Sequence, residues 1–148
     1  MSDMRELYQE IILDHNKQPR NCYVMDCANK SADGHNPLCG DTVKVYLRIS
    51  DGVISEISFQ GAGCAICTAS TSLMTESVKG KTVAEAKDLF DGFHHMLTGV
   101  ADEQGVELGK LQVFEGVREY PVRVKCATLA WHTLNAAMEG ADDKVTTE

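Results

Sequence analysis

The sequence lacks the features that would place it in a membrane or on nucleic acid. It has no long apolar run that could cross a bilayer. Its first residues, MSDMRELYQEIILDH, carry acids and a short amphipathic repeat instead of the basic start and apolar core of a signal peptide. Positive charge is scarce, because 14 Lys and Arg against 22 Asp and Glu leave a net charge of -8, which disfavours phosphate backbones. We therefore expect a soluble, cytoplasmic protein with no membrane and no nucleic acid among its main partners.

The chain also lacks internal repeats, linkers and low-complexity tracts. A chain of 148 residues is long enough to bury roughly 70% of its unfolded surface in one core, so neither a disulfide nor a metal is needed merely for folding. We expect residues 1–148 to form one domain with a short polar tail from about residue 141. In a reducing compartment, six cysteines are typical of metal or sulfur chemistry rather than of disulfides.

Alternating apolar and polar residues predict a small antiparallel sheet. Residues 42–49 alternate strictly, with Val43 at the start of the face expected to be buried. Asp51-Gly52 is typical of a hairpin turn, and residues 53–59 continue as the return strand. Residues 23–30 are the candidate for a third strand.

Helical periodicity and end signals predict helices on both sides of these strands in the sequence. The expected helices run from Asp3 to about His15, from the Gly61-Ala62-Gly63 turn to Lys79-Gly80, from the Thr82/Glu85 capping box toward His95, and from Pro121 onward. The glycine-punctuated residues 98–119 are expected to hold a short helix or turn. The sequence thus predicts an α+β domain in which helices cover a three-stranded antiparallel sheet.

Three cysteines lie where a strand or loop meets a predicted helix. Cys39 precedes the first long strand, Cys64 follows the glycine-rich turn, and Cys126 lies near the start of the last helix. A thiol at a helix N-terminus loses its proton more readily, and Gly40 lets Asp41 face the same point as Cys39. Three thiolates and a carboxylate from three segments indicate a metal site. The alternative for any single cysteine is a small buried apolar residue, which fits poorly in polar, glycine-rich turns.

Other cysteines and histidines allow further interpretations. Cys67 completes a Cys-x-x-Cys with Cys64, so a redox dithiol stays open as a lesser alternative to a small helix residue. The thioredoxin interpretation needs a βαβ unit, whereas a hairpin precedes this motif. A zinc deaminase is excluded because His-x-Glu and Pro-Cys-x-x-Cys are absent. The remaining cysteines and the histidines are given no ligand role: Cys22, Cys27, His15, His35, His94, His95 and His132.

Three motifs in order resemble a known family. They are HNPLCGD at residues 35–41, GAGCAI at residues 61–66 and YPVRVKCATL at residues 120–129. They resemble the iron-sulfur cluster assembly proteins related to the N-terminal domain of NifU, whose branches include IscU and SufU, and the similarity runs from about Leu7 to Ala137. Lys125 stands where the IscU branch usually has His, and this residue, with the glycine-rich insertion at 98–119, resembles SufU.

The resemblance implies a zinc-dependent sulfurtransferase whose partner is a cysteine desulfurase and which passes sulfur to downstream iron-sulfur assembly proteins. It implies zinc held by Cys39, Asp41, Cys64 and Cys126, with Cys39 released as the sulfur acceptor. Arg123 is implied as a support of the loosened site, and a solvated helix-end charge is its alternative. The rival is a scaffold, not an enzyme, that builds a [2Fe-2S] cluster on the same four residues.

Overall fold

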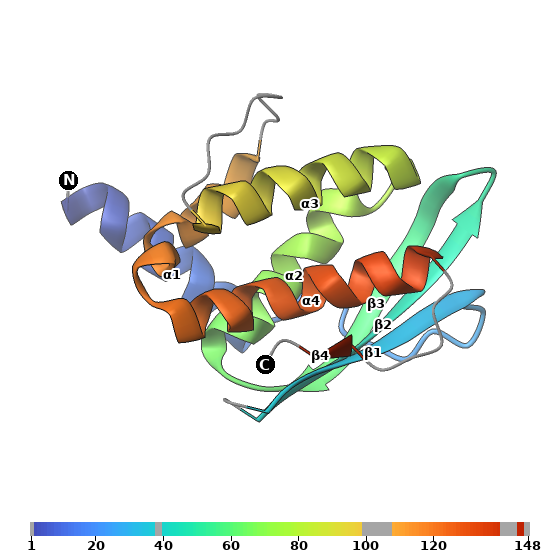
Figure 1. Ribbon diagram of the computed structural model, residues 1–148, viewed down its shortest axis with the longest axis horizontal. Coiled ribbons are helices and arrows are strands. Elements are labelled where there is room, and N and C mark those ends of the chain that lie inside the picture. The colour runs from blue at the N-terminus through green and yellow to red at the C-terminus, as the bar shows by residue number, and fades with distance from the viewer. Residues whose placement is uncertain (1, 38–39, 99–107, 140–144, 147–148) are drawn as a thin grey trace.

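The computed structural model of this chain describes residues 2–37, 40–98, 108–139 and 145–146. Figure 1 shows a sheet at one side of the molecule and helices packed on it. In chain order the elements are α1 (Ser2–Lys17), β1 (Lys30–Asn36), β2 (Asp41–Ser50), β3 (Val53–Ala62), α2 (Ala65–Val78), α3 (Val83–Thr98), the 3-10 helix η1 (Gly109–Glu119), α4 (Pro121–Glu139) and β4 (Val145–Thr146).

The sheet has the order β3-β2-β1-β4, and its first three strands are antiparallel as predicted. Asp51 and Gly52 both have positive φ, 54° and 77°, which is the geometry of the tight hairpin turn expected between β2 and β3. The short β4 pairs parallel to β1, with Val145 opposite Gly34. The sequence had indicated only a polar tail there, because two residues are too few to show a strand period.

The position predicted for the third strand is wrong. The strand β1 begins at Lys30, and residues 23–29 form turns and loop. The alternation of apolar and polar residues failed as a guide because the buried positions of β1 lack large apolar side chains. They are Ala32, Gly34 and Asn36. A Cβ atom on Gly34 would lie 2.1 Å from Thr133 Oγ1 of α4, so the helix packs directly on this strand and leaves no room for larger residues.

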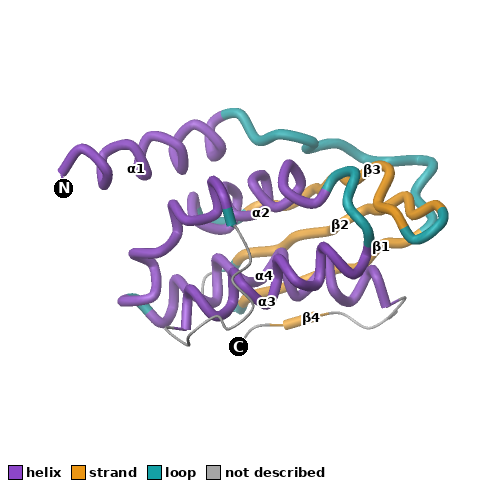
Figure 2. Tube along the Cα trace, turned by 90° about the horizontal axis from the view of Figure 1, so that it is seen from above, coloured by secondary structure: helices purple, strands orange, loops and turns teal. Residues whose placement is uncertain are grey.

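The helices α2 and α4 lie on one face of the sheet, and α3 packs outside them (Figures 1 and 2). An aromatic cluster joins the layers: the Phe93 and Trp131 rings are stacked with centroids 5.1 Å apart, and Phe114 of η1 meets Phe93 edge to face. All three side chains are completely buried. Trp131 lies in the middle of α4, the helix that also packs on β1 and β2 and carries Cys126 in its second turn.

Helix ends agree with the sequence signals. Thr82 Oγ1 accepts from Glu85 N at 3.1 Å, and the Glu85 carboxylate accepts from Thr82 N at 3.0 Å, so the predicted capping box is confirmed. The α2 helix ends before Gly80, whose φ of +84° suits the glycine found there. Of the segment predicted to hold a short helix or turn, residues 99–107 lie outside the described residues, and η1 follows them.

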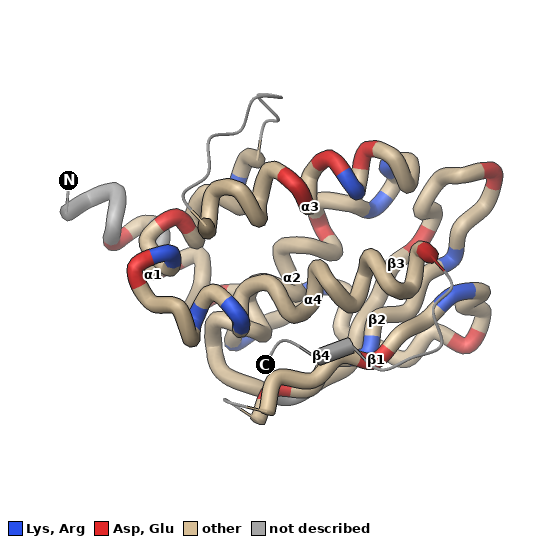
Figure 3. Tube along the Cα trace, in the orientation of Figure 1, with Lys and Arg blue, Asp and Glu red and all other residues tan. Residues whose placement is uncertain are grey.

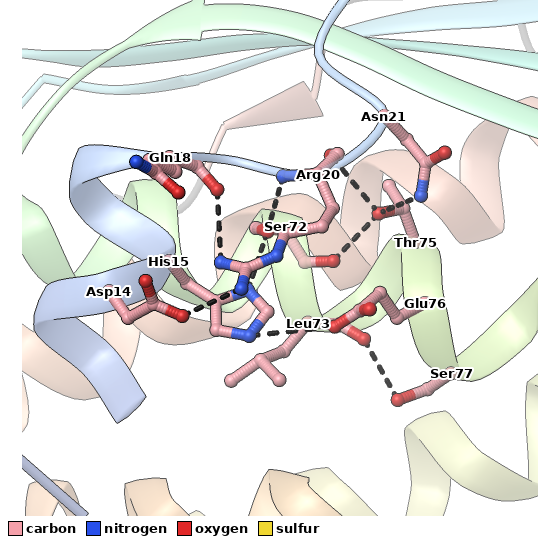
Figure 4. A network of polar contacts seen from close by, with 10 residues as sticks. All are labelled: Asp14, His15, Gln18, Arg20, Asn21, Ser72, Leu73, Thr75, Glu76 and Ser77. Atoms are coloured by element: carbon pink, nitrogen blue, oxygen red, sulfur yellow. Dashed lines mark hydrogen bonds and ion pairs between the residues drawn. The ribbon is translucent and has the colours of Figure 1, made fainter. Parts of the chain in front are cut away.

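Polar contacts fasten α1 and the loop after it to the middle of α2 (Figure 4). Ser72 Oγ accepts from Arg20 N at 2.8 Å and lies 2.7 Å from His15 Nδ1, while His15 Nε2 lies 3.5 Å from Glu76. Asn21 Nδ2 donates to Thr75 Oγ1. We call these residues the anchor network: His15, Arg20, Asn21, Ser72, Thr75 and Glu76. Sequence patterns gave no sign of it, since its members are ordinary polar residues far apart in the chain.

Acidic and basic residues are spread over the helices and over the strands β1 to β3 (Figure 3). Helix α3 is mainly acidic, with Lys87 among Glu85, Asp88 and Asp91, whereas the start of α4 carries Arg123 and Lys125. Among the described residues, no helix is long and apolar enough to cross a membrane.

Candidate metal site

Three of the four predicted ligands meet at one point. Asp41 begins β2, Cys64 is the N-cap of α2, and Cys126 lies in the second turn of α4. One ligand atom from each lies within 4.8 Å of the others. Cys39, the fourth predicted ligand, lies outside the described residues. Asp41 and Cys64 are 23 positions apart in the sequence, and Cys64 and Cys126 are 62 positions apart. The fold brings the three residues together, as their motifs had indicated.

Backbone geometry holds Asp41 and Cys64 against each other. Asp41 Oδ1 accepts a hydrogen bond from Cys64 N at 2.8 Å, and Asp41 Oδ2 lies 3.9 Å from Cys64 Sγ. A Cβ atom on Gly63 would lie 2.4 Å from Asp41 Oδ1, so only glycine allows this approach. Gly40, before Asp41, has a φ of +72°. Gly63 is needed for the close approach of Asp41, and Gly40 for the left-handed backbone before Asp41.

The N-terminus of α2 points at the sulfur of Cys64. Cys64 Sγ accepts from Cys67 N at 3.5 Å, as a serine or aspartate would at an N-cap. The positive end of the helix dipole at this position stabilises negative charge on the thiolate and on the neighbouring carboxylate. Both ligands therefore lie where an anionic donor is favoured.

Two residues before the site add contacts that the sequence did not indicate. Asn36 is completely buried, and its Nδ2 donates to Cys126 Sγ at 3.5 Å. His35 Nδ1 lies 3.2 Å from the backbone oxygen of Asp41. Asn36 belongs to the HNPLCGD motif but received no role, because an asparagine beside a proline is equally typical of a turn. The one sequence feature that could have indicated a role for Asn36 was its place in the HNPLCGD motif.

The donor set fits a divalent cation. Asp41 and Cys126 are both 0% exposed, and Cys64 is half-buried. A buried carboxylate is costly unless a positive charge compensates it, and the ion pairs between described residues involve Asp14 and Glu76, not Asp41. Two thiolates and one carboxylate are ligands that tetrahedral zinc accepts, and thiolates also hold iron-sulfur clusters. These three residues could therefore hold a metal ion.

The other candidates lie in different settings. Arg123 is exposed in the first turn of α4, and its proposed support of the site stays a prediction. Cys67 is buried in the core at 3% exposure, and Cys22 and Cys27 are exposed.

The histidines near α4 pack as expected. The His132 ring meets Phe90 edge to face at 5.1 Å and lies 6.1 Å from the His94 ring. Burial lowers the pKa of His132 below its ordinary value, and the charge of His94 lowers it further. A neutral imidazole among aromatic rings is a packing residue here.

Comparisons with known proteins agree with the motifs. Residues 7–127 match the NifU-like N-terminal domain. The chain is 35% identical over 133 residues to the zinc-dependent sulfurtransferase SufU of Bacillus subtilis, with 90% of both chains covered. It is 37% identical over 139 residues to the iron-sulfur cluster assembly scaffold protein IscU of Streptococcus pyogenes, covering 94% of this chain and 87% of that one.

Solved structures give the same result. A crystal structure from Fervidobacterium islandicum, described as an iron-sulfur cluster assembly scaffold protein for the SUF system, superposes with a TM-score of 0.83 at 37% identity. The match covers 87% of this chain and 94% of that one. The N-terminal part of a NifU-like protein from Brucella abortus superposes with a TM-score of 0.80 at 26% identity, covering 90% and 93% of the two chains.

Proposed function

Since the chain belongs to the NifU-like N-terminal domain family, we propose that it serves iron-sulfur cluster assembly by accepting persulfide sulfur from a cysteine desulfurase. The acceptor is Cys39, and the site is a zinc site held by Cys39, Asp41, Cys64 and Cys126. The observation that carries the proposal is the convergence of Asp41, Cys64 and Cys126 within 4.8 Å. A surface serving mainly as a docking module would not need to bury a carboxylate beside two thiols.

Zinc bound to these residues would keep the thiols ionised at neutral pH and tolerate exchange of one ligand. Asp41 keeps the N-terminus of α2 in place through its bond to Cys64 N, whatever Cys39 does. The amide of Asn36 holds Cys126 in the same way. The site can thus keep its shape on these residues while the fourth acts as a nucleophile.

The transfer itself is a thiol exchange at sulfur. The Cys39 thiolate attacks the outer sulfur of the desulfurase persulfide, a new sulfur-sulfur bond forms on Cys39, and the desulfurase cysteine leaves as a thiolate. No net oxidation occurs, because the transferred sulfur keeps its oxidation level. Arg123, exposed one turn before Cys126, is proposed to stabilise negative charge as the persulfide arrives.

Two measurements test this proposal together. Elemental analysis and an absorption spectrum of the anaerobically purified protein should give about one colourless zinc per chain, the stoichiometry of one four-ligand site. Adding the protein to its own desulfurase with a thiol reductant should increase sulfide release. Cys39→Ala should abolish the stimulation, whereas Cys27→Ala, which changes an exposed cysteine, should keep it.

The scaffold function is the outcome that would replace sulfur transfer. Visible iron-sulfur absorption bands in the purified protein, with no stimulation of the desulfurase, would show that the same ligands hold a [2Fe-2S] cluster instead. If the Cys39→Ala variant stimulated the desulfurase as fully as the wild type, Cys39 would not be the sulfur acceptor.

A further inference from the structure

Hydrogen bonds join the elements that carry the candidate metal ligands, and two of these bonds are made at the ligands themselves. Asp41 Oδ1 of β2 accepts from Cys64 N at the start of α2. Asn36 Nδ2 of β1 donates to Cys126 Sγ of α4. Asn36 and Asp41 lie opposite each other in the β1–β2 ladder, so both helices are bonded to the same end of the sheet. The junction between α2 and α4 remains to be fixed.

A buried serine of α2 bridges that junction. Ser70 Oγ donates to the backbone oxygen of Ala127 in α4 at 2.6 Å. Both residues are completely buried, and Ala127 directly follows the ligand Cys126. A carbonyl oxygen has two lone pairs, so a helical carbonyl can accept this hydroxyl in addition to the N–H that the helix supplies. Removal of the hydroxyl therefore leaves the bonding of α4 itself in place.

With this bond, the contacts form a closed circuit around the site. Ser70 lies six positions after Cys64 on α2, which is about 9 Å at the rise of an α-helix. A helix is stiff over so short a distance. Fixing its middle against α4 therefore also fixes how far its first turn lies from Cys126. The ligand atoms of Cys64 and Cys126 lie within 4.8 Å of each other.

The bond adds directionality to the contact between α2 and α4. Apolar burial holds two helices together, but it is non-directional and does not by itself select one offset between them. A hydrogen bond has a narrow range of length and angle. Groups that bind a metal must be held within roughly 0.5 Å of their productive positions. A directional bond one residue from a ligand serves that requirement.

We propose that Ser70 is a positioning residue of the metal site, which holds the Cys64 and Cys126 sulfurs at the spacing that one metal ion needs. This role rests on the metal-binding part of the proposed function and is independent of the sulfur transfer. It also deepens that function. When Cys39 accepts sulfur, three ligands remain, and Ser70 keeps the two thiolates among them together.

A second serine of the same helix provides a matched control. Ser72 is also completely buried, but its hydroxyl accepts from Arg20 N in the loop after α1, on the side of the anchor network (Figure 4). Ser70→Ala and Ser72→Ala remove the same group from the same helix, and alanine is a good helix former, so both variants should fold. They differ in the element that loses its bond to α2. Both should lower the free energy of unfolding, and only Ser70→Ala should change the metal site.

The test uses cobalt(II) as the probe, because zinc has a filled d shell and its site is colourless, whereas tetrahedral cobalt(II) with thiolate ligands absorbs visible light. The reduced, metal-free full chain is titrated anaerobically with cobalt(II) against a competing chelator. Ser70→Ala should lose about ten-fold in cobalt affinity, as is typical of changes around metal ligands. Its visible bands should also shift or weaken, because the ligands are no longer held at the same spacing. Ser72→Ala should match the wild type in affinity and spectrum.

Two results would overturn this role for Ser70 alone. If Ser70→Ala kept the affinity and spectrum of the wild type, the serine would only stabilise the fold. If Ser70→Ala and Ser72→Ala lost affinity equally, the loss would come from lower stability and not from ligand spacing. A wild-type chain without thiolate–cobalt bands would refute the zinc site and this role together. If Ser70→Ala weakens the site but the wild type does not stimulate the desulfurase, the sulfur transfer fails alone.

Discussion

Helix α2 carries two polar clusters that differ in how their atoms are satisfied. In the anchor network, the Ser72 hydroxyl accepts from Arg20 N and lies 2.7 Å from His15 Nδ1, and His15 Nε2 lies 3.5 Å from Glu76. At the candidate metal site, Asp41 Oδ1 accepts from Cys64 N, while Asp41 Oδ2 lies 3.9 Å from Cys64 Sγ. The polar atoms of the anchor network bond to one another within the chain, whereas the candidate metal site has a set of donors that a cation would complete.

This difference separates stability from function along one helix. A network that satisfies itself stabilises the fold, so damage to it should appear in the free energy of unfolding. A site that needs a ligand should show damage in affinity for that ligand. Substitutions at the two ends of the described α2 segment can therefore be compared directly.

The largest effect is expected from Gly63→Ala. The new Cβ would overlap Asp41 Oδ1, so the carboxylate or the N-terminus of α2 must move out of position. Since changes around metal ligands cost up to about 100-fold in affinity, we expect zinc affinity to fall by about 100-fold. A competition titration against a chromogenic chelator measures it. Gly116→Ala is the matched control, because nothing lies within 4 Å of its added Cβ, and a comparable loss there would contradict the steric explanation.

Asn36→Ala comes next. It removes the amide that donates to Cys126 Sγ and leaves the ligands in place, so zinc affinity should fall by about 10–100-fold, as is typical of outer-shell changes. Asn29→Ala removes an exposed asparagine that bonds the backbone of Ile49 far along the strand, and it should leave the affinity unchanged. Equal affinities for the two variants would show that Asn36 has no part in the site.

Ser72→Ala tests the other cluster. It leaves His15 Nδ1 and Arg20 N without their partner in a buried place, and such losses cost about 1–3 kcal/mol of the free energy of unfolding. Urea unfolding measures the change, with zinc affinity expected to stay near wild type. Ser77→Ala, whose hydroxyl bonds only within the same helix, should change stability by less than about 0.5 kcal/mol. A drop in zinc affinity for Ser72→Ala would show that the two clusters are coupled.

The comparison also shows what the sequence could reveal. The convergence of Asp41, Cys64 and Cys126 was predictable because each lies in a short motif with glycine or proline nearby. The hairpin and the capping box have local signals of the same kind. Motifs work where the chemistry needs particular residue types at fixed spacing.

Features that depend on packing between distant segments were not predictable. The strand β1 has few apolar residues because α4 lies against it, so residues 23–29 resembled a strand more than the true one did. The anchor network joins His15 to Ser72 across 57 positions with residues that are common in any surface helix. The contact of Asn36 with Cys126 spans 90 positions. No local pattern encodes such pairs.

The smallest effect is expected from a change of pH. It should appear in the free energy of unfolding and come from buried histidines. Burial lowers the pKa of His15 and of His132 below the ordinary value near 6.5, and neighbouring Arg20 adds to the shift at His15. The unfolded chain therefore binds more protons than the folded chain just below that value. Stability from these residues is fully present above about pH 6.5 and is lost as the pH falls toward their lowered folded-state pKa values.

Urea unfolding of the metal-free protein between pH 7.5 and 5.5 measures this slope without interference from metal ligands. The free energy of unfolding should fall with pH in the wild type, and His132→Phe, which keeps a ring against Phe90, should reduce the slope. His15→Gln should reduce it as well, although the loss of the Ser72 contact lowers stability at every pH. If both variants kept the wild-type slope, the buried imidazoles would not be the source. The pH dependence of the free energy of unfolding would then have to come from carboxylates. The contribution of the anchor network to stability would not change with pH in this range.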